Sequence, residues 1–479
     1  MKRTFLLILL LVVSIGSVSI FASNVYKEHD NVTFQENVLY GDRSAADGLN
    51  LKLYSNQSHQ LFWDTTCEFD NEVAVNTDYK FYSMNHPVDS PESFLGISFM
   101  CNSDYAPGYA AYSETTIAQP GISAAYQELF HSLNPGEEKE KTIFLKDYMD
   151  YYEFDITFSF PNCTNYGNTS ELLYSDPEAI KVDHTLIALN DIKEYFKIPV
   201  LDTETHLISV GKHTSGALTS LGGGTSESER FDMESWSVST DSSCYFTFNP
   251  RSTEGNLVDL SELPEGFGIF ALPYTRVSDD IKFDFSTVKT DQISMVYTLD
   301  PNAEIYSLDI DESKTKLFLY TKEDGQLWMT VIDIATMSTL QKFSLIETSE
   351  DSWPSIYNYS YFIAVFDSYK EQITVFALNE KQEYEFQFTC DYQPAEDMEY
   401  YWYPAGLAYD GERLATTGTL RNYSYGNKDY CDFYIMIYDK DGLQYLGRYD
   451  NSLDSGLDGD WYDYPCKIDY SNTMDISWR

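Results

Sequence analysis

Acidic side chains crowd one stretch near the C-terminus, and their types are the first in the chain to suggest chemistry. The aspartates are Asp450, Asp454, Asp458, Asp460 and Asp463. Carboxylate oxygens are ligands that calcium prefers, and the glycines at 456 and 459 would let a loop turn around an ion. The spacing does not match the D-x-[DN]-x-[DN]-G calcium loop. A solvated acidic turn is therefore favoured, calcium is the alternative, and no metal ligand is assigned.

Two aromatic runs could offer flat surfaces to a sugar ring or a peptide. They are Tyr400-Tyr401-Trp402-Tyr403 and Trp461-Tyr462-Asp463-Tyr464, in a chain with 40 tyrosines and 7 tryptophans. Aromatic rings combine apolar faces with polar edges, which suits such ligands. Aromatic residues also fill the cores of sheets, and this structural role is the favoured one for most of them. Trp402 and Trp461 are the expected anchors if the runs bind a ligand.

The sequence lacks the usual motifs of catalytic and metal sites. The seven histidines, at 29, 59, 86, 131, 184, 206 and 213, show neither i, i+4 nor H-x-H spacing, so structural or surface roles are expected for them. There is no G-x-S-x-G and no C-x-x-C. Gly211-Lys212-His213-Thr214 ends like a phosphate-binding loop, but His206 occupies the place of its leading glycine. We assign no catalytic, cofactor-binding or metal-binding residue.

The N-terminus predicts export. Met1-Lys2-Arg3 precedes an apolar stretch at residues 5–22, the order of a signal peptide. This stretch is also just long enough to span a bilayer, so residues 1–23 are either cleaved near Ser23 or kept as an N-terminal membrane anchor. In both cases we expect an extracytoplasmic protein, secreted or held at the outer face of the cytoplasmic membrane. Membrane contact is expected only through residues 5–22, if they are uncleaved.

The charge narrows the class of partner. The chain has 31 basic and 76 acidic residues, a formal net charge of −45. A field of that sign repels phosphate backbones, so nucleic acid is excluded as a partner. An extracytoplasmic glycan or peptide is expected instead. Seven scattered cysteines are too few for a disulfide scaffold and leave the pairing of any isolated bridge open.

Strand patterns dominate the chain, with short helices only in its N-terminal half. Leu49–Cys67 reads as two strands around a polar turn, and the alternation at 156–160 indicates another strand. Helical spacing at 121–133 ends before Asn134-Pro135-Gly136, and a second short helix is expected at 190–196. The glycine- and serine-rich segment 221–230 reads as a linker or loop. It would separate a β-rich region, 24–220, from a second region, 231–479.

A repeat of four strand-like runs begins after this loop. One copy spans 305–346, which is 42 residues (346 − 305 + 1) and the size of a propeller blade. A second copy covers 356–389, and a third includes the tight hairpin at Asp439-Lys440-Asp441-Gly442. The last residues read as the opening of a fourth copy. The strands of Leu51–Cys67 could complete that sheet, since a half-built blade would leave its strand edges exposed.

From about residue 266 to 479 the chain therefore resembles the secreted β-propeller proteins, at the level of the class. Thr321, Glu323, Gly325 and Trp328 are spaced like the S-x-D-x-G-x-x-W hairpin box of sialidase-like propellers. That resemblance implies a turn stabilised by an acidic side chain and a packed tryptophan, without catalysis. We expect an all-β, β-propeller-like repeat of four-stranded sheets. Tandem β-sandwich domains are the alternative.

Two functions remain open. The favoured one is a non-enzymatic extracytoplasmic binding or sensing protein of unknown ligand, because the chain combines an export signal and aromatic runs with no catalytic motif. The alternative is a secreted carbohydrate or peptide hydrolase that uses paired carboxylates. Two such acids meet only in the folded chain, so the sequence does not separate the two functions.

Overall fold

The structure is a computed structural model of the whole chain. It describes residues 9–20, 23, 33–57, 61–70, 72–81, 96–101, 122–152, 154–159, 195–225, 231–254, 258–274, 289–349, 352–392, 404–418, 433–451 and 474–479. Antiparallel strands dominate this part of the chain, which confirms the predicted all-β class. The chain forms two compact units. The first joins both ends of the chain, Met1–Pro91 and Asp351–Arg479, and the second is Glu92–Glu350.

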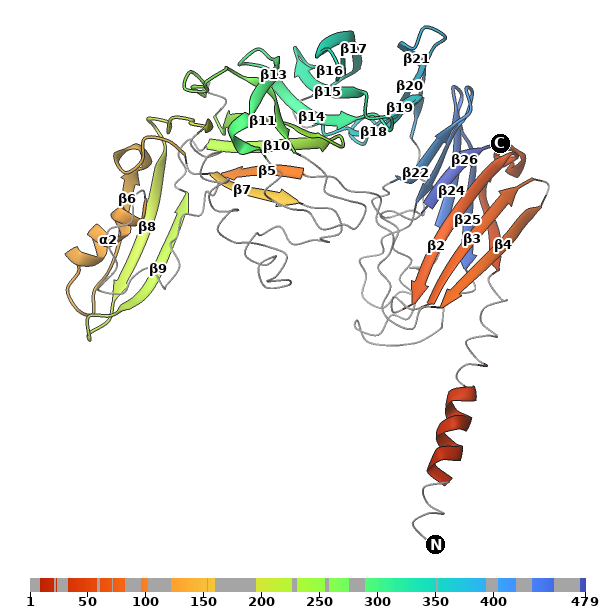
Figure 1. The fold of residues 1–479 in the computed structure, drawn as a ribbon, viewed down its shortest axis with the longest axis horizontal. Coiled ribbons are helices and arrows are strands. Elements are labelled where there is room, and N and C mark those ends of the chain that lie inside the picture. The colour runs from red at the N-terminus through yellow and green to blue at the C-terminus, as the bar shows by residue number, and fades with distance from the viewer. Residues whose placement is uncertain are drawn as a thin grey trace. The chain divides into compact units, whose positions relative to one another are not determined.

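The described residues of the first unit form three antiparallel sheets (Figure 1). The first is β18 (Ser355–Tyr359), β19 (Phe362–Asp367), β20 (Gln372–Leu378) and β21 (Tyr384–Asp391). The second is β22 (Pro404–Tyr409), β23 (Leu414–Gly418), β24 (Phe433–Asp439) and β25 (Gly442–Asn451), extended by β1 (Phe34–Gly41). The third is β26 (Met474–Trp478), β2 (Leu49–Gln57), β3 (Leu61–Phe69) and β4 (Val73–Phe81).

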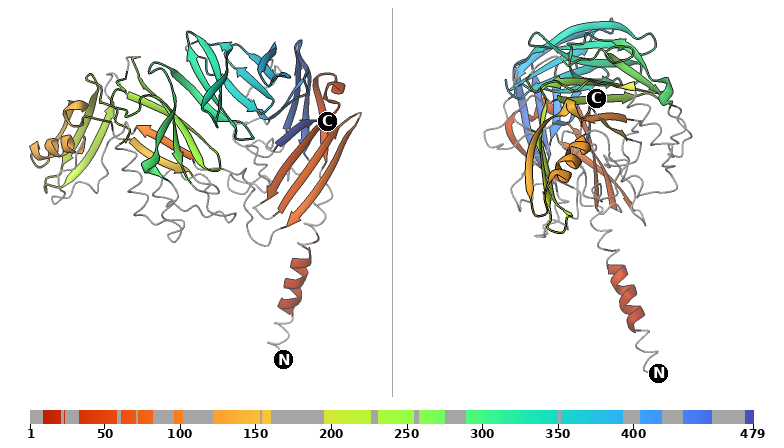
Figure 2. Two further views of the ribbon diagram at one scale, coloured as in Figure 1. Left: turned by 45° about the horizontal axis from the view of Figure 1, so that its top comes forward. Right: turned by 90° about the vertical axis from the view of Figure 1, so that its left-hand side faces the viewer.

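The third sheet is built from both ends of the chain. The C-terminus lies beside the red and orange N-terminal strands (Figure 2). Strand β26 pairs with β2, with Leu49 opposite Trp478 and Leu53 opposite Met474. This confirms that the N-terminal strands complete the last blade-sized sheet. The pairing satisfies backbone groups that both segments would otherwise leave at an open edge. Buried side chains fill the space between neighbouring sheets of this unit, for example Phe362 and Tyr438 in one cluster and Leu51 and Ile435 in another.

Strand β1 adds a fifth strand to the sheet of β22–β25, which the repeat did not predict. Tyr445 donates a hydrogen bond to Glu36 at 2.8 Å, and its hydroxyl lies 2.5 Å from that of Tyr449. Arg43 pairs with the same carboxylate, with Nε 3.1 Å from Oε2. At Gly41, where φ is +73°, a Cβ would overlap the carbonyl oxygen of Gln444. Only glycine lets β1 approach β25 so closely.

In the second unit, the described residues form two four-stranded sheets, two smaller sheets and an α-helix. The four-stranded sheets are β10 (Phe231–Ser239), β11 (Ser243–Ser252), β12 (Gly268–Pro273) and β13 (Ser294–Thr298), then β14 (Glu304–Ile310), β15 (Lys316–Glu323), β16 (Gln326–Asp333) and β17 (Ser338–Glu347). The smaller ones pair β5 (Gly96–Cys101) with β7 (Phe154–Ser159), and β6 (Glu138–Phe144) with β8 (Thr205–Lys212) and β9 (Leu218–Thr225). Strand β7 confirms the predicted strand for residues 156–159, and residue 160 lies outside the described part of the chain.

The connectivity supports the repeat and not the tandem-sandwich alternative. In the sheets of β10–β13, β14–β17, β18–β21 and β22–β25, neighbours in the sheet are neighbours in sequence. Such up-and-down meanders are the blades of β-propellers, whereas sandwiches use Greek-key connections between two sheets. The protein is therefore mostly β, with a propeller-like repeat of four-stranded sheets.

Helix α2 (Ile122–Ser132) confirms the better of the two helix predictions. Ile122, Ala125, Tyr126 and Leu129 recur at helical spacing and are buried. The helix packs on β6 and β8, and the chain turns after it at Gly136, where φ is +86°. Of the second predicted helix, residues 190–194 lie outside the described part of the chain.

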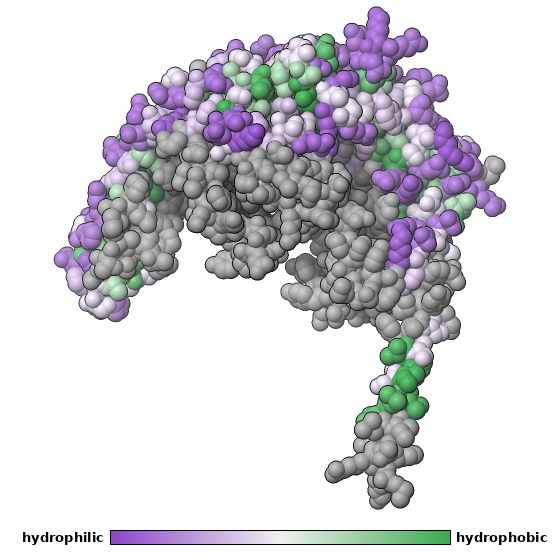
Figure 3. Space-filling model, viewed as in Figure 1, coloured by the Kyte–Doolittle hydropathy of each residue, from purple (hydrophilic) through white to green (hydrophobic). Residues whose placement is uncertain are grey.

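Residues 9–20 also form a helix, within the predicted export segment 5–22. Its hydrophobic side chains, such as Leu10 and Val18, are exposed, and the face in view is mostly hydrophobic (Figure 3). Among the described residues, no helix is both long enough and apolar enough to cross a membrane. The signal peptide or anchor stays a prediction.

The segment expected to be a linker is partly strand. Residues 221–225 belong to β9, where they pair with β8, and residues 226–230 lie outside the described residues. Tyr126 donates a hydrogen bond to the Gly222 carbonyl at 3.2 Å, and a Cβ at Gly223 would overlap the Tyr126 hydroxyl. The glycines therefore let α2 pack closely on the sheet, a use that composition alone does not distinguish from flexibility.

Candidate functional site

Most residues that the sequence proposes for binding lie outside the described part of the chain. This holds for Asp454, Asp458, Asp460 and Asp463 and for both aromatic runs, including Trp402 and Trp461. Asp450 is in β25, where it pairs with Gln35 of β1. Within the ranges that the structure does describe, no group of three or more His, Cys, Asp or Glu side chains could hold a metal ion. The calcium alternative stays a prediction.

The described histidines lie on separate elements. His131 is in the last turn of α2, His206 is buried in β8, and His213 follows β8. The His213 ring accepts a hydrogen bond from the backbone N–H of Ser215 at 3.1 Å. These three histidines form no common site. The other four lie outside the described residues.

The hairpin box forms a turn, but not with the contacts that the resemblance implies. Asp324 and Gly325 both have positive φ, 49° and 74°, between β15 and β16. The Glu323 carboxylate accepts hydrogen bonds from Thr321 Oγ1 and from Lys342 Nζ, both at 2.8 Å, and not from backbone N–H groups of the turn. Burial opposes ionisation of Glu323, but these hydrogen bonds outweigh it and lower its pKa. Lys342 Nζ also lies 5.5 Å from the centroid of the half-buried Trp328 ring.

Many acidic side chains of the repeat hold turns. Asp311 accepts hydrogen bonds from the backbone N–H groups of Thr315 and Lys316 at 2.6 and 2.7 Å. The carboxylates of Asp333, Asp367, Asp410 and Asp439 likewise accept backbone N–H bonds from residues two or three positions later. An Asp side chain that satisfies turn N–H groups in this way stabilises the hairpin. Part of the acidity therefore has a structural use.

Three further carboxylates are occupied by structural partners. Arg251 bridges Asp232 and Glu234, which share one face of β10, at 3.4 and 2.8 Å. Glu204 is buried, and accepts hydrogen bonds from the hydroxyl of Tyr152 and, at 3.3 Å, from the backbone N–H of Phe231. These acids therefore support the fold more directly than they support acid–base catalysis.

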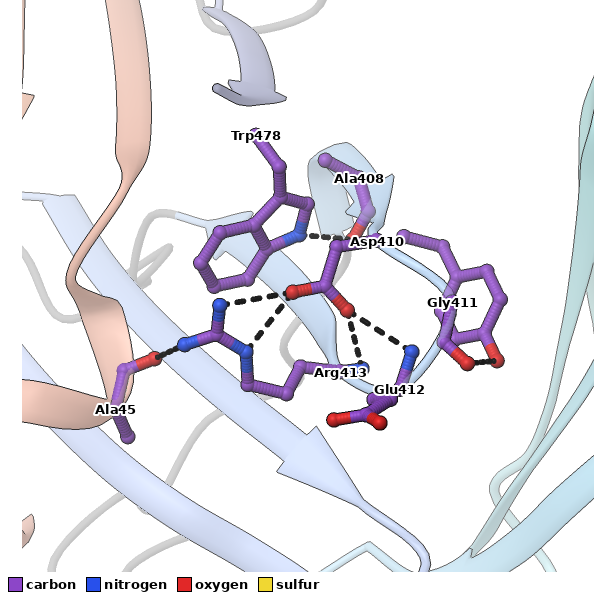
Figure 4. Close-up of polar contacts among 8 residues, drawn as sticks. Ala45, Ala408, Asp410, Gly411, Glu412, Arg413 and Trp478 are labelled. Carbon is purple, nitrogen blue, oxygen red and sulfur yellow. Dashed lines mark hydrogen bonds and ion pairs between the residues drawn. The ribbon is translucent and has the colours of Figure 1, made fainter.

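A polar clasp joins the second and third sheets of the first unit (Figure 4). The Arg413 guanidinium lies 4.1 Å from the centroid of the Trp478 ring, and its Nη1 donates to the Ala45 carbonyl at 2.8 Å. Both oxygens of Asp410 are used: Oδ1 accepts the Arg413 N–H at 2.7 Å, and Oδ2 accepts Arg413 Nε at 2.9 Å. Trp478 Nε1 donates to the Ala408 carbonyl at 3.2 Å. This clasp holds the closure formed by the two chain ends.

Exposed aromatic side chains gather on the sheet of β18–β21. Among the described residues, seven aromatic side chains are more than a third exposed, and four of these belong to this sheet and its flanks. The four are Trp353, Tyr361, Tyr369 and Phe386. Exposed apolar side chains that share one part of a surface mark interaction sites more often than scattered residues do. The candidate binding surface is therefore the part of this sheet where exposed rings share one end.

Two of these aromatic residues lie at the same end of the sheet. Trp353 comes just before β18, Tyr369 lies in the turn between β19 and β20, and Ser355 at the start of β18 pairs with Phe366 at the end of β19. Trp353 is 55% exposed, although both its neighbours, Ser352 and Pro354, are buried. Tyr369 is 65% exposed. We call this region, formed by 352–354 and 367–370, the Trp353/Tyr369 end.

A buried carboxylate fixes the backbone at the Trp353/Tyr369 end. Asp367 is 4% exposed, and its Oδ1 accepts hydrogen bonds from the Ser352 hydroxyl at 3.1 Å, the Tyr369 N–H at 3.0 Å and the Lys370 N–H at 3.2 Å. Asp367 therefore ties the segment before β18 to the turn after β19. This tie sets the position of both exposed aromatic residues.

Sequence reasoning did not single out Trp353, Asp367 or Tyr369. The sequence did contain a signal that these rings are exposed. Trp353 precedes a proline, and Tyr369 follows Asp367-Ser368 in a turn between two strands. Both residues therefore fall outside the alternating pattern of core side chains. An aromatic side chain at a strand end or in a polar turn has no core position to fill. Such positions are better candidates for exposed rings than runs of consecutive aromatics.

The solved structures similar to this chain include β-propellers. One is the periplasmic gluconolactonase of Pseudomonas aeruginosa, with 10% identity over 84% of this chain and 95% of that one and a TM-score of 0.29. Another is the β-propeller domain of Cps50 from Myceliophteria thermophila, with 9% identity over 51% and 82% and a TM-score of 0.23. A protein described as a 6-phosphogluconolactonase from Bacteroides fragilis has 8% identity over 85% and 100% and a TM-score of 0.26.

No protein-family model matches the chain, and no curated protein matches its sequence. The likeness to solved structures concerns the fold class alone.

Proposed function

We propose that the protein is a non-enzymatic binding or sensing protein that works outside the cytoplasm and holds a peptide or glycan at the Trp353/Tyr369 end. The observation that carries the proposal is that two exposed aromatic side chains, Trp353 and Tyr369, lie at the same end of one sheet. Rigid aromatic rings supply large contact areas at low entropic cost and are enriched at binding surfaces. The acidity of the chain, at −45, favours neutral or cationic partners.

Binding is favoured over hydrolysis by the occupation of the described carboxylates. Asp311, Asp367 and Asp410 hold turns, and Glu204 holds buried donors. A hydrolase with two acids would need one carboxyl as proton donor and one as base or nucleophile, both facing the substrate. The export segment at residues 5–22 supports an extracytoplasmic location.

The test compares two double variants that both remove exposed rings from the same sheet. The first variant, Trp353→Ala with Tyr369→Ala, removes both exposed rings of the Trp353/Tyr369 end. The matched control, Tyr361→Ala with Phe386→Ala, removes two exposed rings elsewhere on the same sheet. Titration calorimetry with acetylated tri-arginine, acetylated tri-alanine and cellotetraose measures affinity. We expect the first double variant to weaken binding of at least one probe about tenfold or more, and the control to bind like the wild type.

The melting temperature of each variant serves as the folding control. Substitution of these exposed residues should change the free energy of unfolding by no more than about 0.5 kcal/mol. Equal binding by both double variants and the wild type would refute the proposal. So would hydrolysis of a probe that stops when one acidic residue is changed without unfolding, because this outcome favours the hydrolase.

A further inference from the structure

Asn249 is a buried polar side chain without a hydrogen-bond partner. It lies in β11, is 5% exposed, and forms no side-chain hydrogen bond with the described residues. Its amide still reaches solvent, whereas the Thr416 hydroxyl, which also lacks a partner, is closed off from solvent. Nearly all buried polar groups in proteins are hydrogen-bonded, so this amide needs an explanation. A ligand that approaches from solvent would supply the missing partner.

The pairing of β10 with β11 places Asn249 beside three charged side chains (Figure 1). Glu234 is directly opposite Asn249, and Asp232 is opposite Arg251, two residues further along β11. Opposite residues of two paired strands share a face of the sheet, as do residues two apart on one strand, and opposite Cβ atoms lie about 5 Å apart. These four side chains therefore form one group, which we call the β10/β11 cluster.

The charged side chains of the β10/β11 cluster are held in place and are open to solvent. Arg251 Nε lies 3.4 Å from Asp232 Oδ2, and Arg251 Nη2 lies 2.8 Å from Glu234 Oε1. The three side chains are 35–44% exposed. Exposed ion pairs contribute little to stability, because water and salt screen them. Their clearer effect is to orient carboxylate acceptors and guanidinium donors beside the buried amide.

The chemistry of the β10/β11 cluster fits a ligand that is rich in hydroxyl groups. An amide donates and accepts hydrogen bonds, a carboxylate accepts and a guanidinium donates, and a hydroxyl group can pair with each of them. Arg251 already neutralises one of the two carboxylates, so the cluster attracts a cation only weakly. Trp236 follows Glu234 by two residues on the same face and is half-buried. Aromatic side chains of this kind provide the apolar neighbour that a sugar ring requires.

We infer that the β10/β11 cluster is a second binding site, in the second unit, and that its ligand is a neutral sugar. The Asn249 amide pairs with one hydroxyl group, and Glu234 and Arg251 pair with neighbouring hydroxyl groups through stronger, charge-assisted hydrogen bonds. A cationic ligand would meet the charge of Arg251, and an anionic one would meet two carboxylates. The site goes beyond the proposed function, which rests on residues of the first unit.

The test is titration calorimetry of the full chain with three neutral tetrasaccharides: cellotetraose, maltotetraose and mannotetraose. Spermidine and tetragalacturonate are the cationic and anionic probes. We expect at least one neutral tetrasaccharide to bind, with an affinity that does not change with salt. Asn249→Leu keeps the approximate size and removes the amide, so it should weaken this binding about tenfold or more. Its melting temperature should not fall, because no hydrogen bond to a described residue is lost, whereas a structural amide would be missed.

A second variant tests the site through an exposed residue. Glu234→Gln removes one charge of the cluster and should weaken sugar binding about fivefold or more. Glu262→Gln makes the same change at an exposed glutamate of the same unit and is the matched control, which should bind like the wild type. Because Glu234 is exposed, its variant decides the question even if Asn249→Leu fails to fold.

The outcomes separate this site from the Trp353/Tyr369 end. The double variant Trp353→Ala with Tyr369→Ala should leave binding at the β10/β11 cluster unchanged. Failure of all three neutral tetrasaccharides to bind would overturn the inference, as would equal binding by the wild type, Asn249→Leu and Glu234→Gln. Dependence on Asn249 that is seen only with spermidine or tetragalacturonate would also overturn it. Sugar binding that depends on Trp353 and Tyr369 but not on Asn249 would refute this site and support the proposed function.

Discussion

The clasp between Arg413 and Trp478 gives the stability prediction with the best-defined magnitude. Arg413→Ala removes a charged hydrogen bond to the Ala45 carbonyl, an ion pair with Asp410 and a cation–π contact. A hydrogen bond from a charged group contributes about 1.5–3 kcal/mol, a cation–π contact about 0.5–1 kcal/mol, and a partly exposed pair about 0.2–1 kcal/mol. The three share one side chain and do not add fully, so the expected loss is about 2–3 kcal/mol.

This loss should be visible as a lower melting temperature. The first unit has 220 residues, 91 from Met1–Pro91 and 129 from Asp351–Arg479. For a unit of about this size, 1 kcal/mol shifts the melting temperature by about 2–4 °C, so Arg413→Ala should lower it by about 5–10 °C. Differential scanning calorimetry measures the shift. Trp478→Leu in a double-mutant cycle should reveal a coupling of about 0.5–1 kcal/mol.

The matched control removes a surface ion pair from the same unit. Lys440 pairs with Asp441 at 2.6 Å, and their side chains are 74% and 69% exposed. Lys440→Ala should not shift the melting temperature measurably, because exposed pairs are screened by water and salt. If Arg413→Ala behaves like Lys440→Ala, the clasp does not stabilise the closure, and the reasoning is refuted.

Three further predictions concern the backbone, the turns and the thiols. Gly41→Ala should destabilise the first unit by about 2 kcal/mol or more in urea unfolding, because its Cβ would overlap the Gln444 carbonyl at a positive φ; an unchanged midpoint would contradict this. Burial opposes ionisation of Asp311, but its hydrogen bonds outweigh this and lower its pKa, so its contribution is present above about pH 4 and lost as the pH falls further; Asp311→Asn should flatten the acid limb of a stability–pH curve, and an identical limb would rule this out. Burial raises the pKa of Cys67 and Cys390 to about 12, so maleimide labelling followed by peptide mass mapping should modify them only on unfolding, and fast native labelling would show the thiols are accessible.

The repeat of strands could be predicted from the sequence because each sheet is formed locally. The runs at 305–346 became β14–β17, and the hairpin at Asp439–Gly442 joins β24 to β25. Closure by the N-terminal strands was also predictable, because the last strands lacked partners. The sheet of β10–β13 was not identified as a copy. It spans 68 residues (298 − 231 + 1), and this longer spacing hides the repeat.

Features that depend on contacts between distant residues could not be predicted. Strand β1 joins β25 through Glu36, Tyr445 and Tyr449, more than 400 residues apart in sequence. The Arg413 clasp likewise joins three segments that the sequence does not relate. Gly222 and Gly223 belong to a segment that looks like a flexible loop, but the structure uses them for close packing under Tyr126.

The candidate site was missed because composition does not separate exposed rings from buried ones. Many described tyrosines are core residues, whereas others are half-buried or exposed. Tyr126, Tyr320, Tyr438, Tyr445 and Tyr449 are among the largest fully buried side chains. Exposure at Trp353 and Tyr369 follows from the end of a strand and a turn, and Asp367 acts on both through backbone hydrogen bonds that no local motif announces.

The most direct test of the binding site is to observe Trp353 itself during a titration. Full-length protein labelled with 5-fluorotryptophan gives a fluorine resonance for Trp353, which Trp353→Phe assigns by its loss. Addition of acetylated tri-arginine should shift this resonance in a saturable way, since a cation on the ring face changes its electrostatic environment. The resonance of Trp63, which is 3% exposed in the core, should stay in place. A Trp353 resonance that does not move while tri-arginine binds elsewhere, or no binding at all, would contradict the site.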